Sequence, residues 1–355
     1  MDAHTNPRIA EWRRVRPERE GSGGVDLRVG AARTLLVGDP ATARFMLAAM
    51  AGFTACSGEL LIDGDPVTER PAHRRRVVLI GPDPGFQGGR VAAVVARTAR
   101  GGPALEATLT DTGLSGRADW TVDRLDAGEK LRLAIARAAA SHPRLIALDG
   151  ALDPLDPGMT DAALRALAAI RARLGCAVVI HTARPAALIG RPAGTVECVA
   201  ALVGGRVAQA DTPAAVYDDP ADPAVLELLG PTNLFAAIVL DREEDGSRCT
   251  LADGTMVEAT ATANAPVVGG ACKIDVRPER IALAVGTELA GEAGLIGRIE
   301  AVSFEGPWTS FSIRLRAGDI ALLVRRPAGS PLGQLVAGAD VSVAWQAHHA
   351  RIWPA

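Results

Sequence analysis

One stretch, residues 35–47 (LLVGDPATARFML), limits more than any other what this chain can fold into. It starts with three apolar residues, passes through Gly38 and a run of small residues, and ends in a segment with the composition of a helix. A short buried strand that enters a helix through a glycine-containing loop is the layout of a phosphate-binding loop, in which backbone N–H groups surround phosphates. We therefore expect a strand–loop–helix unit at this point of the chain.

The residue types in this stretch depart from the template G-x-x-x-x-G-K-[ST]. Gly38 fits the first position, but Ala43 stands at the second glycine, Arg44 at the lysine and Phe45 at the hydroxyl residue. Arg44 keeps a positive charge on a longer, planar group, whereas Phe45 cannot ligate Mg²⁺ and Pro40 lacks an N–H group. No shift of register restores both the lysine and the hydroxyl. The stretch thus predicts a phosphate loop by fold that does not bind Mg-ATP productively.

Strands and helices alternate through the first two thirds of the chain. Apolar strands are expected at 25–29, 35–37, 59–62, 77–80, 145–149 and 177–180, and helices at 44–51, 127–141 and 160–174, with a mostly helical, Ala-rich segment at 91–118. This alternation predicts a parallel sheet with helices on its faces. Ligands of such sheets bind at the carboxyl ends of the strands, where both Gly38 and Asp149 fall.

The pattern changes after a Pro- and Asp-rich segment at 218–223. Short strands with turn signals follow, at 236–240, 272–276, 297–303, 309–315, 320–325 and 341–345. Such a series predicts a small all-β barrel or sandwich. We place the domain boundary between residues 232 and 233.

Composition limits the function classes. The net charge of −3 gives no electrostatic reason to expect nucleic-acid binding. No apolar run reaches the ~18–20 residues that span a bilayer, and the charged N-terminal segment lacks the apolar core of a signal peptide. We therefore expect a cytosolic protein. The five cysteines show no C-x-x-C spacing and are expected to be buried, reduced thiols.

Several framework segments together resemble one family. They are 57–59 (SGE) with 62–64 (IDG), 132–143 (RLAIARAAASHP), 155–156 (LD), 204–207 (GGRV) with 211–213 (DTP), 233–235 (NLF) and 276–281 (VRPERI). In this order they resemble the ATPase subunit of an ABC importer that carries a C-terminal TOBE domain, as polyamine-, iron-, sulfate- and maltose-type subunits do. The resemblance implies a P-loop NTPase-like ABC nucleotide-binding domain at 1–232 and a TOBE-type, OB-like β-domain at 233–355.

The resemblance also implies ligands and partners. The expected cofactors are ATP and Mg²⁺, and the expected partners are transmembrane permease subunits and a second nucleotide-binding subunit, in a homodimer or in a heterodimer with a competent ATPase. The chain would then lie at the inner face of the cell membrane. The residues expected to contact the nucleotide are Gly38, Asp39, Thr42, Ala43, Arg44, Phe45, Gly128 and Asp149, with Asp149 also holding the metal.

Most positions that carry the family's chemistry hold other residues here. Gly81 stands where a glutamine touches metal and water, and Gly150 where the catalytic glutamate polarises water. Asp126 replaces the serine of the signature loop, where it is expected to cap a helix instead. Thr182 replaces the switch histidine. No aromatic residue lies at 15–20 to stack on adenine, and Trp12 is the nearest candidate.

His181, one residue before the switch position, is the only candidate catalytic residue. A one-residue offset in a strand turns a side chain to the opposite face, which argues against a substitution of the switch histidine by His181. The missing groups act as a unit, so their losses do not simply add.

Three functions remain open from the sequence. The first is a catalytically impaired subunit of an ABC importer, for example of the spermidine/putrescine type. The second is an active ABC ATPase in which Arg44, His181 and another base substitute for the missing groups. The third is a stand-alone regulatory or binding module whose β-domain binds a protein, or a small oxyanion through arginines at 277, 280, 325 and 326.

Overall fold

The computed structural model describes residues 9–18, 24–86, 88–99, 105–189, 191, 196–242, 246–262, 264–286, 295–317, 319–331 and 333–355. The chain divides into two compact units, Met1–Leu229 and Gly230–Ala355. None of the helices in the described ranges is long and apolar enough to cross a bilayer.

A six-stranded sheet forms the centre of the first unit, with strand order β10-β9-β3-β8-β7-β6. Neighbouring strands are parallel except for the antiparallel β9–β10 pair. The bounds are β3 (Arg33–Gly38), β6 (Val77–Ile80), β7 (Leu145–Asp149), β8 (Ala177–His181), β9 (Cys198–Val203) and β10 (Arg206–Asp211). The predicted parallel sheet is therefore confirmed.

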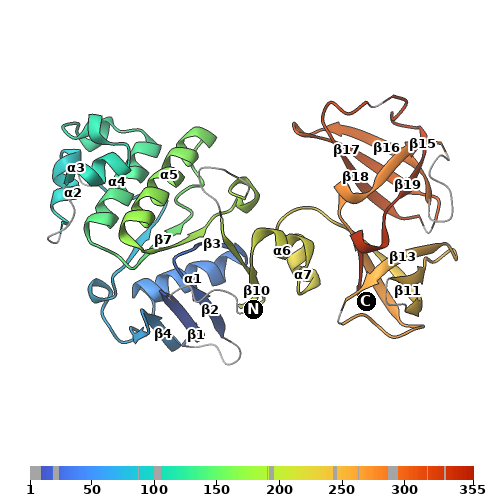
Figure 1. Ribbon diagram of the computed structural model, residues 1–355, viewed down its shortest axis with the longest axis horizontal. Helices are drawn as coiled ribbons and strands as arrows, with labels where there is room; N and C mark the ends of the chain where they lie inside the picture. The colour runs from blue at the N-terminus through green and yellow to red at the C-terminus, as the bar shows by residue number, and fades with distance from the viewer. Residues whose placement is uncertain are drawn as a thin grey trace. The chain divides into compact units, whose positions relative to one another are not determined.

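A second sheet of four strands, in the order β2-β1-β4-β5, accompanies the central sheet. Its strands are β1 (Ala10–Pro17), β2 (Val25–Val29), β4 (Cys56–Ile62) and β5 (Asp65–Pro66), and the helix α1 (Pro40–Ala51) packs with it. Buried residues of α1, of this sheet and of one face of the central sheet, such as Leu36 and Val179, form one apolar cluster. Figure 1 shows α1 beside β1, β2 and β4.

Helices α4 (Ala127–Ala140) and α5 (Pro157–Leu174) cover the opposite face of the central sheet (Figure 1). The period of two along each strand explains the division, because Leu35 and Val37 join the cluster of α4 and α5 while Leu36 joins that of α1. The remaining helices of this unit are α2 (Val91–Ala96), α3 (Leu105–Asp111), α6 (Pro213–Asp218) and α7 (Pro223–Leu226).

The second unit is all-β, as predicted. It contains a closed barrel in the order β11-β12-β13-β20-β14 and a five-stranded sheet in the order β15-β19-β16-β17-β18. The strands are β11 (Asn233–Arg242), β12 (Ser247–Thr250), β13 (Met256–Ala261), β14 (Ala271–Val276), β15 (Ala282–Val285), β16 (Leu295–Phe304), β17 (Trp308–Leu315), β18 (Ala321–Pro327), β19 (Asp340–Ala344) and β20 (Ala350–Pro354).

The start of α1 differs from the prediction. The helix was expected from Arg44, but it begins at Pro40. Asp39 caps the helix and Pro40 occupies its first turn, a pair that favours helix initiation because proline fixes φ and its missing N–H needs no partner there. The end of α1 agrees with the prediction, since Gly52 closes it in a left-handed conformation with φ of 83°.

Candidate functional site

The carboxyl ends of β3, β8 and β7 are neighbours in the central sheet, and with the first turn of α1 they border a pocket of about 1030 Å³. Its lining includes Gly38, Pro40, Arg44, Asp149, Gly150, Asp153, His181, Thr182 and Glu227. Four residues predicted from the sequence, namely Gly38, Arg44, Asp149 and His181, therefore share one cavity.

The other predicted nucleotide contacts lie elsewhere. Asp39, Thr42 and Phe45 line a separate pocket of about 500 Å³ beside the end of β1 and the β9–β10 turn. Ala43 is fully buried in the core under α1. Gly128 is buried near the start of α4, where an added Cβ would lie 2.8 Å from Met159 Cγ, so close packing against α5 explains this glycine.

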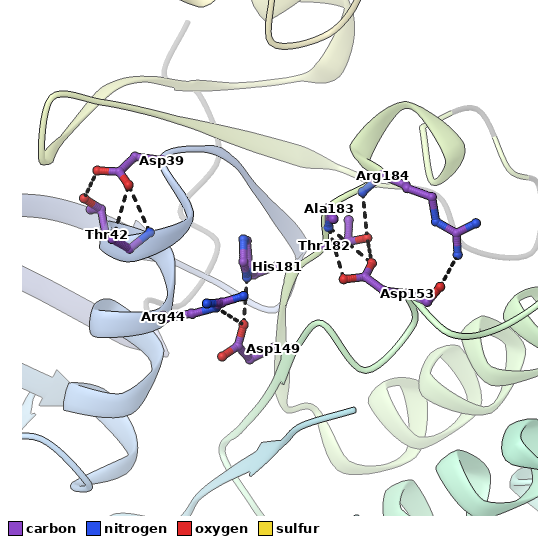
Figure 2. A network of polar contacts seen from close by, with 10 residues as sticks. Asp39, Thr42, Arg44, Asp149, Asp153, His181, Thr182, Ala183 and Arg184 are labelled. Atoms are coloured by element: carbon purple, nitrogen blue, oxygen red, sulfur yellow. Dashed lines mark hydrogen bonds and ion pairs between the residues drawn. The ribbon is translucent and has the colours of Figure 1, made fainter. Parts of the chain in front are cut away.

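The side-chain carboxylate of Asp39 accepts hydrogen bonds from the first turn of α1. Oδ1 of Asp39 accepts hydrogen bonds from the backbone N–H of Ala41 (2.9 Å) and Thr42 (3.4 Å), and Oδ2 accepts one from the Thr42 hydroxyl (2.6 Å), as Figure 2 shows. Free N–H groups at a helix start are what makes it an anion site. Here Asp39 takes two of them and Pro40 has none to offer.

These hydrogen bonds, that of the Thr42 hydroxyl first, hold the pKa of Asp39 below its usual value. A depressed carboxyl pKa adds stability above the unfolded-state pKa of about 3.9, and that stability is lost as pH falls through the folded-state pKa. We expect Asp39→Ala to lower the free energy of unfolding at pH 7 by about 1 kcal/mol, because the cap is lost. Asp39→Asn keeps a capping oxygen and should be nearly neutral.

Denaturant unfolding of the three proteins between pH 3 and pH 7 checks this expectation. The difference between wild type and Asp39→Ala should shrink towards acid pH, while the stability of Asp39→Asn should depend less on pH. A constant difference across the range would contradict the role assigned to the ionised carboxylate.

Asp149 and His181 lie opposite each other in the β7–β8 register, and their side chains meet with His181 Nδ1 2.7 Å from Asp149 Oδ1. Arg44 reaches the same oxygen from α1, with its Nε 3.9 Å away (Figure 2). The expectation that His181 faces away from the site is wrong. The strand ends at His181, so alternation no longer governs Thr182, and both residues line the pocket.

Gly150 follows Asp149 with a φ of 65°, in the left-handed region. Beyond it, the carboxylate of Asp153 accepts hydrogen bonds from the Thr182 hydroxyl and from the backbone N–H of Ala183, at 3.2 Å for Oδ1 (Figure 2). Thr182, at the predicted switch position, thus fastens the end of β8 to the segment after β7. Asp153 belongs to no motif that the sequence offered.

The predicted cap at Asp126 is confirmed. Its Oδ1 accepts the backbone N–H of Glu129 at 2.7 Å, and the Glu129 carboxylate accepts the N–H of Asp126 at 3.1 Å. This reciprocal pair is a capping box. The start of α4 therefore uses its N–H groups within the chain, as the start of α1 does.

Two further predicted positions are the adenine-stacking candidate Trp12 and the glutamine position held by Gly81. Trp12 is buried with 1% of its surface exposed, and its indole N–H donates to Met46 O at 3.1 Å, so it belongs to the core and cannot stack on a base. Gly81 directly follows β6, and Gln87, the nearest glutamine after it, lies outside the described residues.

The Asp39–Pro40 pair is the signal that sequence reasoning passed over. An Asp followed by a proline before an apolar-periodic run marks the start of a helix. The phosphate-loop template, applied position by position, concealed this signal. No sequence pattern pointed to Asp153 or Glu227, because only the fold brings them to the pocket.

Comparison with known proteins adds family evidence to this geometry. Residues 274–353 match the family model of the TOBE domain. The Fe(3+) ions import ATP-binding protein FbpC 1 of Rhodococcus jostii is 32% identical over 282 residues, which cover 76% of this chain and 73% of that protein. The spermidine/putrescine import ATP-binding protein PotA of Rubrobacter xylanophilus is 30% identical over 242 residues, covering 67% and 61%.

Solved structures agree on the fold. The cbiO1 protein of Clostridium perfringens, part of the ABC transporter complex cbiONQ, matches with a TM-score of 0.53 at 19% identity over 61% of this chain and 92% of its own. A nucleotide-free ATP-binding cassette from an ABC transporter matches with a TM-score of 0.52 at 15% identity, covering 62% and 98%. Together with the relatives and the TOBE match, this similarity shows that the chain belongs to the family of ABC importer ATP-binding subunits that carry a C-terminal TOBE domain.

Proposed function

We propose that this chain serves an ABC importer as a subunit that does not hydrolyse ATP, bound to a transmembrane permease at the cytoplasmic face of the membrane. The names of its relatives favour Fe(3+) or a polyamine such as spermidine or putrescine as the imported solute. Its second nucleotide-binding subunit would be another copy or a competent ATPase chain. The domain boundary at 232/233 belongs to the same proposal.

The single observation that carries this proposal is that the residue directly after Asp149 is a glycine, Gly150. Gly150 offers no carboxylate to polarise water, and its left-handed φ disfavours any other residue there. Loss of a positioned base alone typically reduces a rate by about 10²–10⁴. His181, the other candidate base of this pocket, is hydrogen-bonded through its Nδ1 to Asp149.

The residues at the expected nucleotide positions do not fit Mg-ATP either. The N–H groups of the first turn of α1 are held by Asp39, and the residue that should offer a hydroxyl is Phe45. Asp149 is shared by His181 and Arg44 rather than free for a cation. Among the described residues, no group of three or more His, Cys, Asp or Glu side chains is placed to hold a metal ion.

Hydrolysis by the purified full chain tests the proposal. We expect phosphate release from Mg-ATP to stay at the level of a buffer blank, with and without added permease. The matched control is Asp149→Asn, which should leave this baseline unchanged. Turnover at the rates of ordinary ABC ATPases, abolished by Asp149→Asn, would overturn the proposal.

A second candidate, an active ATPase with substituted groups, is favoured by one observation. Arg44, Asp149 and His181 do gather in one pocket, so a cation and a base are present near the expected phosphates. The same assay decides between the two candidates. The third function, anion binding by the β-domain, finds less support, since Arg277 donates to Gly230 O and Arg325 pairs with Glu305.

A further inference from the structure

The imidazole of His181 presents an unused acceptor to the 1030 Å³ pocket. The side chain is buried, with 6% of the residue exposed, and its Nδ1 is held by Asp149. No hydrogen bond to its Nε2 is found within the described ranges. Figure 2 shows the second ring nitrogen turned away from the carboxylate. Because an ionised Asp149 favours a proton on Nδ1, Nε2 is left as an acceptor that faces the cavity.

The net charge of the pocket lining indicates the sign of the charge that a ligand should carry. The lining contains three carboxylates, those of Asp149, Asp153 and Glu227, and one guanidinium, that of Arg44. Glu227 is exposed, and no ion pair of its carboxylate is found in the described part of the chain. The lining stays negative whether His181 is neutral or protonated. Such a cavity repels a polyphosphate and attracts a cation.

The hydrogen-bonding groups that line the pocket limit which kind of cation can bind there. An acceptor nitrogen beside carboxylate oxygens suits a ligand that carries both N–H donors and a positive charge. A metal ion fits less well, because the described residues contain no group of three or more His, Cys, Asp or Glu side chains placed to hold one. The Arg44 side chain is 68% exposed, so it can remain in solvent while the pocket is filled.

We propose that this pocket binds a protonated primary amine, which donates one N–H to His181 Nε2 and is balanced by the carboxylates of Glu227 and Asp153. The inference rests on the proposed function in one respect, that the cavity no longer holds a nucleotide. Amine binding in the former nucleotide pocket would make the importer respond to the amine concentration.

Calorimetric titration of the full chain with 1,4-diaminobutane tests this site. The comparison ligand is the corresponding bis-trimethylammonium compound, which has the same charge and no N–H donor. We expect the diamine to bind and the quaternary compound to bind at least about tenfold more weakly, since one charge-assisted hydrogen bond is worth about that factor or more.

Variants locate the site. Glu227→Gln changes an exposed side chain and should weaken diamine binding about fivefold, while His181→Gln should weaken it about tenfold. Glu258→Gln, an exposed carboxylate of β13 in the second unit, is the matched control and should bind as wild type does. Circular dichroism checks that each variant is folded, and Glu227→Gln keeps the test decisive if His181→Gln is not.

Three results would overturn the inference: no diamine binding, equal binding of the quaternary compound, or equal binding by wild type and Glu227→Gln. These results are separate from those that bear on the proposed function. Absence of both diamine and Mg-ATP binding contradicts the amine site but agrees with the proposal of a non-hydrolysing subunit. Tight Mg-ATP binding that displaces the diamine contradicts the premise that the cavity no longer holds a nucleotide.

Discussion

Arg75→Ala should lower the free energy of unfolding by about 3 kcal/mol, because it removes hydrogen bonds to four backbone carbonyls, two of them buried. The Arg75 guanidinium donates to Ala49 O (2.6 Å) and Met50 O (3.4 Å) at the end of α1, and to Thr68 O (2.5 Å) and the carbonyl of Arg70 (2.6 Å). Only 7% of Arg75 is exposed. Asp39 and Arg75 thus close the two ends of the same helix.

Gly52, which ends α1, makes room for this side chain. An added Cβ at Gly52 would lie 2.9 Å from Arg75 Nε, so the guanidinium and the glycine depend on each other. Arg75→Lys should recover little of the loss, because one ammonium group cannot reach carbonyls on several sides.

Urea unfolding of the two Arg75 variants measures the effect, and Arg74→Ala is the matched control. Arg74 is the exposed neighbour in the same short 3₁₀ turn and should change stability by less than about 0.5 kcal/mol. Equal stability of Arg74→Ala and Arg75→Ala would show that the carbonyl contacts contribute nothing.

Gly150→Glu should fail to create an ATPase, although it introduces the glutamate that the family resemblance predicts at this position. If a missing base were the only defect, the change would raise turnover by about 10²–10⁴. We expect no measurable rise, because Asp39 still closes the first turn of α1 and Asp149 is still bound to His181.

The same variant should also be less stable than wild type by about 1–2 kcal/mol. A residue with a side chain is strained at the φ of 65° found here, and its Cβ would lie 3.3 Å from Asp153 Oδ2, which places two carboxyl groups close together. Phosphate release and thermal unfolding measured on one preparation check both effects. A hundredfold gain in turnover would mean that the rest of the site is intact.

Much of the fold could be predicted from residue patterns. The apolar runs at 145–149 and 177–180 are β7 and β8, and the helical spacing after residue 127 is α4. These elements are local, because each is specified by its own periodicity and by its caps. The start of α1 was mispredicted because a motif template was given more weight than the local Asp39–Pro40 signal.

The site was less predictable, since its contacts depend on how distant segments pair. The meeting of Asp149 and His181 follows from the β7–β8 register, which places them opposite each other. Nothing in the residues around 153 reveals that Asp153 will receive the Thr182 hydroxyl from a segment about thirty positions later. Residue identities can show that chemistry is missing, but only the pairing of strands shows what the remaining groups do instead.

Calorimetric titration of the purified wild-type chain with ATP in the presence of Mg²⁺ tests the central claim most directly. The claim is that the self-capped start of α1, together with Gly150 and the Asp149–His181 pair, has ended nucleotide chemistry in this subunit. The expected result is no binding heat up to about millimolar nucleotide, the concentration at which even weak sites with a free energy of about −4 kcal/mol fill. Saturable binding at micromolar ATP that is lost on removal of Mg²⁺ would contradict it.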